Sequence, residues 1–308
     1  MPAPEAAQTL VRTTRSAISA GTEMLFYRGQ FPQEMAVDAS IEALDEESSY
    51  PMKYGYCAVG VVEALGEGVD ESWLGKRVFS FQPHQSHFVS DVDALFAIPE
   101  NISNEDAVFL PNMETAVNLG MDAHPVIGER VIVFGQGIVG LLTTALLREF
   151  PLEQLVVVDP VPARREAALA LGVDAAFAPN ELNEDNFDLA LELSGAPDAL
   201  NAAIASVGFA GRVVVGSWYG RKPVSLDLGG HFHRERIQVI SSQVSTIAPQ
   251  FSGRWNKARR FGLVWEMLGR VRPAQWISSR IPFEKAEQAY ATLDTSPQDV
   301  LQIVFEYP

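Results

Sequence analysis

The stretch Arg130-Val-Ile-Val-Phe134, followed at once by Gly135-Gln-Gly-Ile-Val-Gly140, decides the fold of this chain. The apolar, β-branched run predicts a buried strand, and the apolar residues after the glycines, to Phe150, predict a helix. A strand that enters a helix through a glycine-rich turn is a typical first unit of a parallel sheet. The segment therefore predicts an α/β architecture around residues 130–150.

Working outward from this unit, strand-like and helical segments alternate. Strand-like runs follow at residues 154–159, 187–192, 212–215 and 237–240, and helical stretches at residues 140–150, 163–171, 196–206 and 255–270. Alternation of this kind is typical of a doubly wound parallel sheet with helices on both faces. The fold class expected for this region is therefore α/β.

The two ends of the chain have a different texture. Strand-like runs separated by Gly, Pro and Asp lie at residues 9–13, 59–65, 77–81 and 87–89, and after Pro273 come a strand, a helix at residues 282–293 and a last strand at residues 301–305. Short strands with turn residues between them predict a mostly β lobe. We therefore expect residues 114–246 to form one domain, inserted into a lobe built from residues 1–113 and 247–308.

Composition restricts the function. The chain has 308 residues and a net charge of −16, from 23 basic and 39 acidic residues, and it contains one cysteine. This charge repels phosphate backbones, so nucleic acid is not an expected partner. No apolar run is long enough to span a bilayer, and the first residues do not resemble a secretion signal. The single Cys57 excludes an internal disulfide and a cysteine-built zinc cluster. We expect a cytoplasmic protein with no membrane partner.

One basic cluster stands out in this acidic chain. It consists of Arg254, Lys257, Arg259 and Arg260. Its simplest interpretation is a solvated helix face, and the alternative is contact with an anionic substrate or a partner subunit.

The glycine turn also carries a function. In such a turn the first glycine allows the tight bend, the second lets the main chain approach a pyrophosphate, and the third lets helix pack on strand. Asp159 ends the next strand, where an acid accepts hydrogen bonds from an adenosine ribose and repels a 2′-phosphate. The pattern favours NAD, while Arg164 and Arg165 keep NADP as an alternative. The expected cofactor contacts in the turn are Gly135, Gln136, Gly137, Ile138, Val139 and Gly140.

These residues, together with the β lobe before them, resemble the medium-chain dehydrogenase/reductase superfamily. The resemblance extends over essentially the whole chain and includes residues 19–23, 55–60, 61–69, 74–78, 110–116, 192–195 and 213–216. It implies a GroES-like β lobe and a Rossmann lobe, with the nicotinamide in the cleft between them. It also implies cofactor contacts at Ser194, Gly195, Gly216 and Ser217, and a homodimer formed through the edge strand near residues 237–242.

The chain departs from the zinc-dependent members of this family. Their Cys-Gly-Thr-Asp motif corresponds here to Ala20-Gly-Thr-Glu23, and in Gly55-Tyr-Cys-Ala-Val-Gly60 the residues Tyr56 and Cys57 occupy the positions of the family's His-Glu pair. A catalytic zinc needs three protein ligands and an open position. The four-cysteine structural lobe is also missing. The sequence therefore predicts no zinc, and the spacing of His84 and His87 does not by itself provide another metal site.

Without a metal, the resemblance and the side-chain chemistry nominate five catalytic residues. Thr22 aligns with the family's substrate-binding hydroxyl, and Tyr56 has a phenol at the position of a zinc ligand. His84 and His87 titrate near neutrality and are candidate proton carriers. Glu114 lies where the family cradles the nicotinamide. Each has a structural alternative: a turn hydroxyl, a packing aromatic, a hydrogen-bonded loop histidine or a helix cap.

The function expected from these observations is a zinc-independent oxidoreductase that transfers hydride between NAD(H) and an alcohol or carbonyl substrate. One alternative is a quinone or enoyl reductase that acts on C=C bonds. The other is a dinucleotide-binding sensor or scaffold without turnover. The partners expected are a small-molecule substrate and a second copy of the chain.

Overall fold

The computed structural model describes residues 3–31 and 50–308. The chain forms two compact units, one from Met1–Pro111 and Leu268–Pro308, and the other from Asn112–Met267. The first is called unit 1 and the second unit 2. Each is described by itself.

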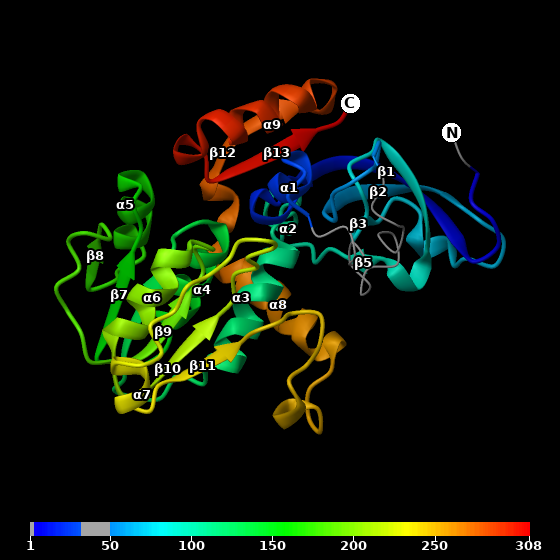
Figure 1. Cartoon of the computed structure of the whole chain (residues 1–308). Helices are drawn as coiled ribbons and strands as arrows, with labels where there is room; N and C mark the ends of the chain where they lie inside the picture. Colours follow the sequence, from blue (N-terminus) through cyan, green and yellow to red (C-terminus); the bar gives the residue numbers. More distant parts are fainter. Residues whose placement is uncertain (1–2, 32–49) are drawn as a thin grey trace. The chain divides into compact units, whose positions relative to one another are not determined.

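Unit 2 is built on a six-stranded sheet in which every neighbouring pair is parallel. Its strands are β6 (Arg130–Phe134), β7 (Gln154–Val158), β8 (Ala175–Phe177), β9 (Phe187–Glu192), β10 (Val207–Val215) and β11 (Gln238–Ser241). They lie in the order β11-β10-β9-β6-β7-β8 (Figure 1). This is the doubly wound arrangement expected from the sequence, with the short β8 as an additional strand.

Helices accompany the sheet of unit 2. They are α3 (Leu110–Ala123), α4 (Ile138–Leu147), α5 (Pro162–Ala170), α6 (Pro197–Ser206), α7 (His231–Arg234) and α8 (Lys257–Val271). Among them, α4, α5 and α6 pack against its strands. Successive residues of β6 point to opposite faces of the sheet, and both Val131 and Ile132 are fully buried. Burial on both faces explains why the strands of this unit are apolar throughout instead of alternating.

Unit 1 contains a seven-stranded mixed sheet made from both ends of the chain (Figure 1). Its strands are β1 (Gln8–Ala17), β2 (Ala58–Leu65), β3 (Arg77–Ser80), β4 (His87–Asp91), β5 (Phe96–Ala97), β12 (Ile277–Pro282) and β13 (Gln302–Glu306). The main order is β12-β13-β1-β2-β3-β5, with β4 paired to β1. Strand β1 pairs antiparallel with β13, so segments near the two ends of the chain lie side by side in this sheet.

Among the described residues, three α-helices lie wholly in unit 1. They are α1 (Ala20–Tyr27), α2 (Asn104–Ala107) and α9 (Ala286–Thr295). Single turns of 3₁₀ helix in unit 1 are η2 (Glu71–Trp73), η3 (Val92–Ala94), η5 (Pro273–Trp276), η6 (Phe283–Lys285) and η7 (Pro297–Asp299). One more, η4 (Pro249–Phe251), lies in unit 2. In the part of the chain that the structure describes, no helix has both the length and the apolar character needed to cross a membrane.

The structure differs from the sequence interpretation at two places. Residues 20–27 form helix α1, where the sequence suggested only a turn. Unit 2 ends at Met267, whereas the sequence placed the end of the inserted domain at residue 246. The reason for the later end is the side chain of Arg260, which ties the segment after β11 into the core of unit 2.

Candidate functional site

The order of the strands in unit 2 reverses between β6 and β9. After β6 the chain continues to β7 and β8 on one side, and β9, β10 and β11 lie on the other. Gly135 follows β6 at this point, and Ser194 lies just beyond β9. Gly135 has φ +93°, and a Cβ on it would lie 2.7 Å from the main-chain nitrogen of Ser194. Ligands of open α/β sheets bind outside the carboxyl ends of the strands at such a reversal.

The other two glycines of the turn have different surroundings. A Cβ on Gly140 would lie 2.0 Å from the carbonyl oxygen of Gly135, so this position admits no side chain. A Cβ on Gly137 would meet nothing within 4 Å. Gly140 is therefore required for helix α4 to pack against the turn, while the main chain at Gly137 is open to a ligand.

Asp159 lies beside this turn, and its carboxylate supports the turn. Its Oδ2 accepts a hydrogen bond of 2.7 Å from the main-chain N–H of Gln136, and its Oδ1 accepts one of 2.8 Å from the N–H of Val161. The residue is 2% exposed. Gln136 is itself fully buried, and its side chain donates to the carbonyl of Gly135. Asp159 thus links β7 to the glycine turn.

A second buried carboxylate, Glu192, lies at the end of β9. Its Oε1 accepts from the main-chain N–H groups of Ser194 and Gly195 at 2.8 and 3.1 Å, and from the Ser194 hydroxyl at 2.5 Å. The Tyr219 hydroxyl donates to its Oε2 at 2.7 Å. Ser217 Oγ accepts from the N–H of Gly195 at 2.8 Å. Glu192 is fully buried, and its place as organiser of this turn was not recognised from sequence.

The remaining cofactor candidates also fall at the carboxyl ends of these strands. Ile138 and Val139 form the first turn of α4, Gly216 follows β10, and Arg164 lies in the first turn of α5. Arg165 donates to the main-chain oxygens of Asp159 and Pro160 at 2.7 and 3.0 Å. The guanidinium of Arg165 therefore supports the main chain at the end of β7.

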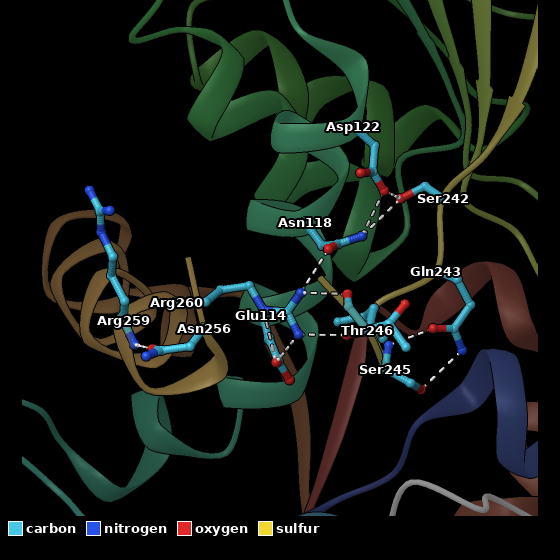
Figure 2. A network of polar contacts seen from close by, with 11 residues as sticks. Glu114, Asn118, Asp122, Ser242, Gln243, Ser245, Thr246, Asn256, Arg259 and Arg260 are labelled. Atoms are coloured by element: carbon cyan, nitrogen blue, oxygen red, sulfur yellow. Dashed lines mark hydrogen bonds and ion pairs between the residues drawn. The ribbon is translucent and has the colours of Figure 1, made fainter. Parts of the chain in front are cut away.

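Unit 2 also contains a buried ion pair between Arg260 of α8 and Glu114 of α3 (Figure 2). Arg260 is fully buried, and Glu114 is 6% exposed. Nε and Nη2 of Arg260 donate to Glu114 Oε1 at 3.1 and 2.6 Å. Nη1 donates to Asn118 Oδ1 at 2.7 Å and to the carbonyl of Thr246 at 3.2 Å, and Nη2 also donates to the carbonyl of Val244 at 2.5 Å. Every N–H donor of the guanidinium is therefore used.

The network continues along α3 toward β11. The side-chain nitrogen of Asn118 donates to Asp122 Oδ2 at 2.9 Å and to Ser242 Oγ at 3.1 Å, and Ser242 in turn donates to Asp122 at 2.7 Å (Figure 2). Together these contacts fix the segment after β11 and the start of α8 to helix α3.

This network corrects one sequence interpretation. Arg260 was assigned to a solvated basic face, but it is buried; its neighbours Arg254, Lys257 and Arg259 are exposed, as expected. Glu114, nominated as a catalytic residue, has its carboxylate paired with Arg260. Burial raises the pKa of Glu114 and the charge of Arg260 opposes the rise. The pairing fixes the Glu114 carboxylate between α3 and α8.

Unit 1 brings together two of the nominated catalytic residues. Tyr56 is half-buried, and its hydroxyl donates to Ser19 Oγ. Burial raises the pKa of Tyr56 to about 12, and hydrogen bonds with the Ser19 and Thr22 side chains oppose the rise. Ser19 precedes α1 and Thr22 lies in its first turn. A phenol with this pKa stays neutral at pH 7 and can donate a hydrogen bond to an oxygen.

His84, a third nominated residue, belongs to a buried chain of polar groups. Its Nε2 lies 3.1 Å from Glu23 Oε2, and its Nδ1 lies 2.7 Å from Ser16 Oγ. Ser16 Oγ also lies 2.8 Å from the Tyr307 hydroxyl, and the Tyr290 hydroxyl donates to Glu23 Oε2 at 2.5 Å. The sequence analysis nominated none of these four partners.

The other histidine and the cysteine have separate environments. His87 Nε2 lies 3.5 Å from Glu63 Oε2, so the two histidines contact different carboxylates. Cys57 donates to the carbonyl of Val108 at 2.9 Å, and burial raises the pKa of its thiol. Among residues 3–31 and 50–308, no group of three His, Cys, Asp or Glu side chains is placed to hold a metal ion.

Comparison with known proteins finds similar dehydrogenases. A model of zinc-binding dehydrogenases matches residues 139–261. The chain is 22% identical over 269 residues to D-guloside 3-dehydrogenase of Escherichia coli K12, covering 82% of this chain and 74% of that protein. It is 30% identical over 220 residues to L-threonine 3-dehydrogenase of Pectobacterium atrosepticum, covering 58% of this chain and 60% of that protein.

Solved structures agree on the fold. The 2R,3R-butanediol dehydrogenase of Bacillus subtilis superposes with a TM-score of 0.79 at 18% identity, covering 100% of this chain and 94% of that one. A short chain alcohol dehydrogenase of Escherichia coli CFT073, solved in complex with NADH, gives the same TM-score of 0.79 at 18% identity and the same coverage, 100% and 94%. The chain therefore has the two-unit fold of these dehydrogenases. The fold class expected from the sequence is thereby confirmed.

The match to the model of zinc-binding dehydrogenases corrects the prediction that the chain uses no zinc. The loss of the motif ligands at Ala20 and Tyr56 was therefore not a sufficient basis for excluding the metal. The donor set of the described residues does not by itself fit a zinc ion.

Proposed function

We propose that this chain is an NAD(H)-dependent oxidoreductase that interconverts an alcohol and its carbonyl compound. The observation that carries the proposal is the glycine turn at the reversal of strand order in unit 2. Gly135 and Gly140 admit no side chain there, while Gly137 faces open space. The dehydrogenase relatives, some of them named for alcohol or polyol substrates, support the reaction class.

The residues at this turn fit a dinucleotide. The start of α4 offers N–H groups and the positive end of the helix dipole to a pyrophosphate. Asp159 fits the adenosine ribose, and its negative charge favours NAD over NADP. Ser194, Gly195, Gly216 and Ser217 would hold the nicotinamide half. When bound, NAD(H) supplies the hydride donor or acceptor.

Tyr56 is the residue we assign to the substrate oxygen. In the oxidation, the alcohol loses a hydride from carbon, which the nicotinamide would accept, and a proton from oxygen, which solvent water would accept because the neutral phenol is not a base. Ser19 accepts the hydrogen of Tyr56 in the free protein. A substrate oxygen would offer this phenol an alternative acceptor, with the Thr22 hydroxyl beside it. In the reverse direction the same phenol donates its hydrogen bond to the carbonyl oxygen that gains negative charge.

Cofactor binding is tested by titrating the purified protein with NADH and NADPH, followed by nicotinamide fluorescence. NADH should bind more tightly, and Gly137→Ala should weaken it at least about tenfold with no loss of folding, because the new methyl group meets only the ligand. Gly120→Ala is the matched control, since a Cβ there also meets nothing within 4 Å. Equal binding of NADH by Gly137→Ala and the unmodified protein would contradict the assignment of the turn.

Turnover is tested with a panel of alcohols and NAD⁺, with and without added Zn²⁺. Tyr56→Phe should lower kcat by about 10²-fold and leave NADH affinity unchanged, because the lost hydrogen bond forms mainly in the transition state. Tyr27→Phe, which alters a phenol that is 50% exposed, is the control. Reduction of activated alkenes alone would instead identify a C=C reductase, and tight NADH binding with no turnover of any substrate would identify a sensor.

We also propose that the chain forms a homodimer through β11. This strand is the edge of the six-stranded sheet, and Val239 on it is 41% exposed. An exposed edge strand offers unpaired main-chain groups to a second sheet. Light scattering should give the mass of a dimer for the unmodified protein and of a monomer for Val239→Lys; a monomeric unmodified protein would exclude the proposal.

A further inference from the structure

Glu23 is a carboxylate buried in unit 1 and surrounded by hydrogen-bond donors. It lies in the first turn of α1 and is 2% exposed. Its Oε1 accepts a 2.6 Å hydrogen bond from the main-chain N–H of Ser19, and its Oε2 contacts the Tyr290 hydroxyl and His84 Nε2. An ionised carboxylate in the interior is stable only when donors surround it, and these three contacts supply such donors.

The directions of these hydrogen bonds fix where the hydrogen of His84 resides. An ionised Glu23 can only accept, so the Nε2 of His84 must carry a hydrogen to form the 3.1 Å contact. In the neutral ring, Nδ1 is then the acceptor for the hydroxyl of Ser16 at 2.7 Å, and Ser16 accepts from Tyr307 at 2.8 Å. In this series of hydrogen bonds from Tyr307 through Ser16 and His84 to Glu23, each contact then joins one donor to one acceptor.

The same carboxylate also reaches the proposed catalytic phenol through the main chain. Glu23 holds the N–H of Ser19, and the hydroxyl of Ser19 accepts the hydrogen of Tyr56. In a capping box, the side chain of the third helical residue accepts a hydrogen bond from the main-chain N–H of the residue that precedes the helix. Here Glu23, the fourth residue of α1, makes this contact to Ser19. The negative charge of Glu23 contributes to the raised pKa of Tyr56, which places the two groups in one electrostatic environment.

We propose that Glu23 is a positioning residue: its carboxylate keeps the hydrogen of His84 on Nε2 and fixes Ser19, and thereby aligns the Tyr56 hydroxyl. This inference rests on the proposed role of Tyr56 at the substrate oxygen. A helix cap alone would require only the Ser19 contact. The additional bonds to a histidine and a tyrosine distinguish this site from a cap, because they connect the helix to β1, α9 and the loop that carries His84.

The state of His84 is directly observable by ¹H–¹⁵N NMR of protein labelled with ¹⁵N-histidine. The chain has five histidines, and His84→Gln identifies the signal of interest. The unmodified protein at pH 7 should show His84 as the neutral ring with its hydrogen on Nε2. Glu23→Gln should abolish this preference, because an amide offers a donor as well as an acceptor. Glu63→Gln is the matched control, since Glu63 contacts His87 instead.

The second measurement is turnover of the alcohol found in the panel above. Glu23→Gln should lower kcat at least about tenfold, with the NADH dissociation constant and the KM of the alcohol nearly unchanged. If Glu23 only capped helix α1, Glu23→Gln would change the midpoint temperature of unfolding and leave kcat of the folded protein unchanged. Tyr290→Phe keeps the charge of Glu23 and its contact to His84, so the NMR signal of His84 in this variant should match that of the unmodified protein. This variant can be measured even if Glu23→Gln fails to fold.

Each result decides the proposal. A ring with its hydrogen on Nδ1, or a doubly protonated ring, in the unmodified protein would overturn it, as would Glu23→Gln with normal kcat. Absence of turnover in the unmodified protein would contradict the proposed function alone, because the NMR signals of the unmodified protein and Glu23→Gln still decide whether Glu23 fixes His84.

Discussion

Two buried glutamates, Glu23 in unit 1 and Glu114 in unit 2, have nearly the same burial, at 2% and 6% exposure. Their partners differ. Glu114 contacts Arg260, a permanent cation whose other donors are taken by an amide and two carbonyls. Glu23 contacts an imidazole, a phenol and a main-chain N–H. An arginine stays protonated at neutral pH, so the network around Glu114 exchanges no proton there. An imidazole can gain or lose a proton near neutral pH, so the network around Glu23 contains a group that can change its protonation state.

This difference indicates that burial alone does not identify a functional carboxylate. Glu114 was nominated because it lies in a family-like segment, and its neighbours turned out to lock α3 to α8 (Figure 2). Glu23 lies in a similar segment and was not nominated. What separates them is whether the partner can change its protonation state, which only the fold reveals.

The largest effect should come from breaking the arginine network. Arg260→Met leaves Glu114 buried without its cation, and removal of one partner from a buried pair costs about 3–5 kcal/mol. We expect the free energy of unfolding, measured by urea denaturation, to fall by that amount. Arg259→Met, one residue earlier in the same helix and exposed, should change it by less than about 0.5 kcal/mol.

The double variant Arg260→Met with Glu114→Leu sharpens this test. Replacement of both charges by apolar groups removes the uncompensated carboxylate, so much of the lost stability should return. If the double variant is as unstable as Arg260→Met, the hydrogen bonds from Arg260 to the carbonyls of Val244 and Thr246 hold the structure and the ion pair does not.

The sequence predicted the fold well because its signals are local. The strand, the glycine turn and the apolar helix occupy consecutive residues, and the role of each glycine depends on main-chain geometry that any such turn shares. Helix α1 was missed because its signal, Ser19 followed by Glu23, is shorter and was interpreted as part of a family motif. The burial of Arg260 was not predictable, because its partners Glu114 and Asn118 are far away in the sequence.

The candidate site was less predictable than the fold for the same reason. His84, Glu23, Ser16 and Tyr290 come from four separate segments, and no spacing in the sequence relates them. Zinc was excluded from two motif positions, and the family match shows that this inference from local residues was wrong. Asp159 was predicted as a cofactor contact, which stays a prediction, and its hydrogen bond from the N–H of Gln136 was visible only in the structure.

An intermediate effect should appear at alkaline pH, and Tyr290 in unit 1 contributes to it. Burial raises the pKa of Tyr290 above its ordinary value near 10, and the charge of Glu23 raises it further. A folded-state pKa above the unfolded value gives stability that is complete below pH ~10 and is lost as the pH rises toward the folded pKa. The free energy of unfolding should therefore fall above pH ~10, by up to about 1.4 kcal/mol per pH unit for each such phenol.

Tyr290→Phe should make that fall shallower, as measured by urea unfolding at a series of alkaline pH values. Arg260→Met should lower stability at every pH and leave the slope unchanged, because nothing in the arginine network titrates there. A slope that is the same in Tyr290→Phe and the unmodified protein would show that the phenol ionises without unfolding, which contradicts its tight coupling to Glu23.

The smallest effect concerns Cys57, the only cysteine of the chain. Burial raises the pKa of its thiol, and the charge of Glu23 adds to the rise. Because the thiolate is the reactive form, alkylation by iodoacetamide should be slow in the folded protein and should report local opening of unit 1. Glu23→Gln removes the nearby charge and a hydrogen-bond acceptor, so alkylation should become a few times faster. Arg260→Met disturbs the other network, and the alkylation rate should stay that of the unmodified protein. Equal acceleration in both variants would mean that the two units open together, and the two networks would then stabilise one cooperative structure instead of serving separate purposes.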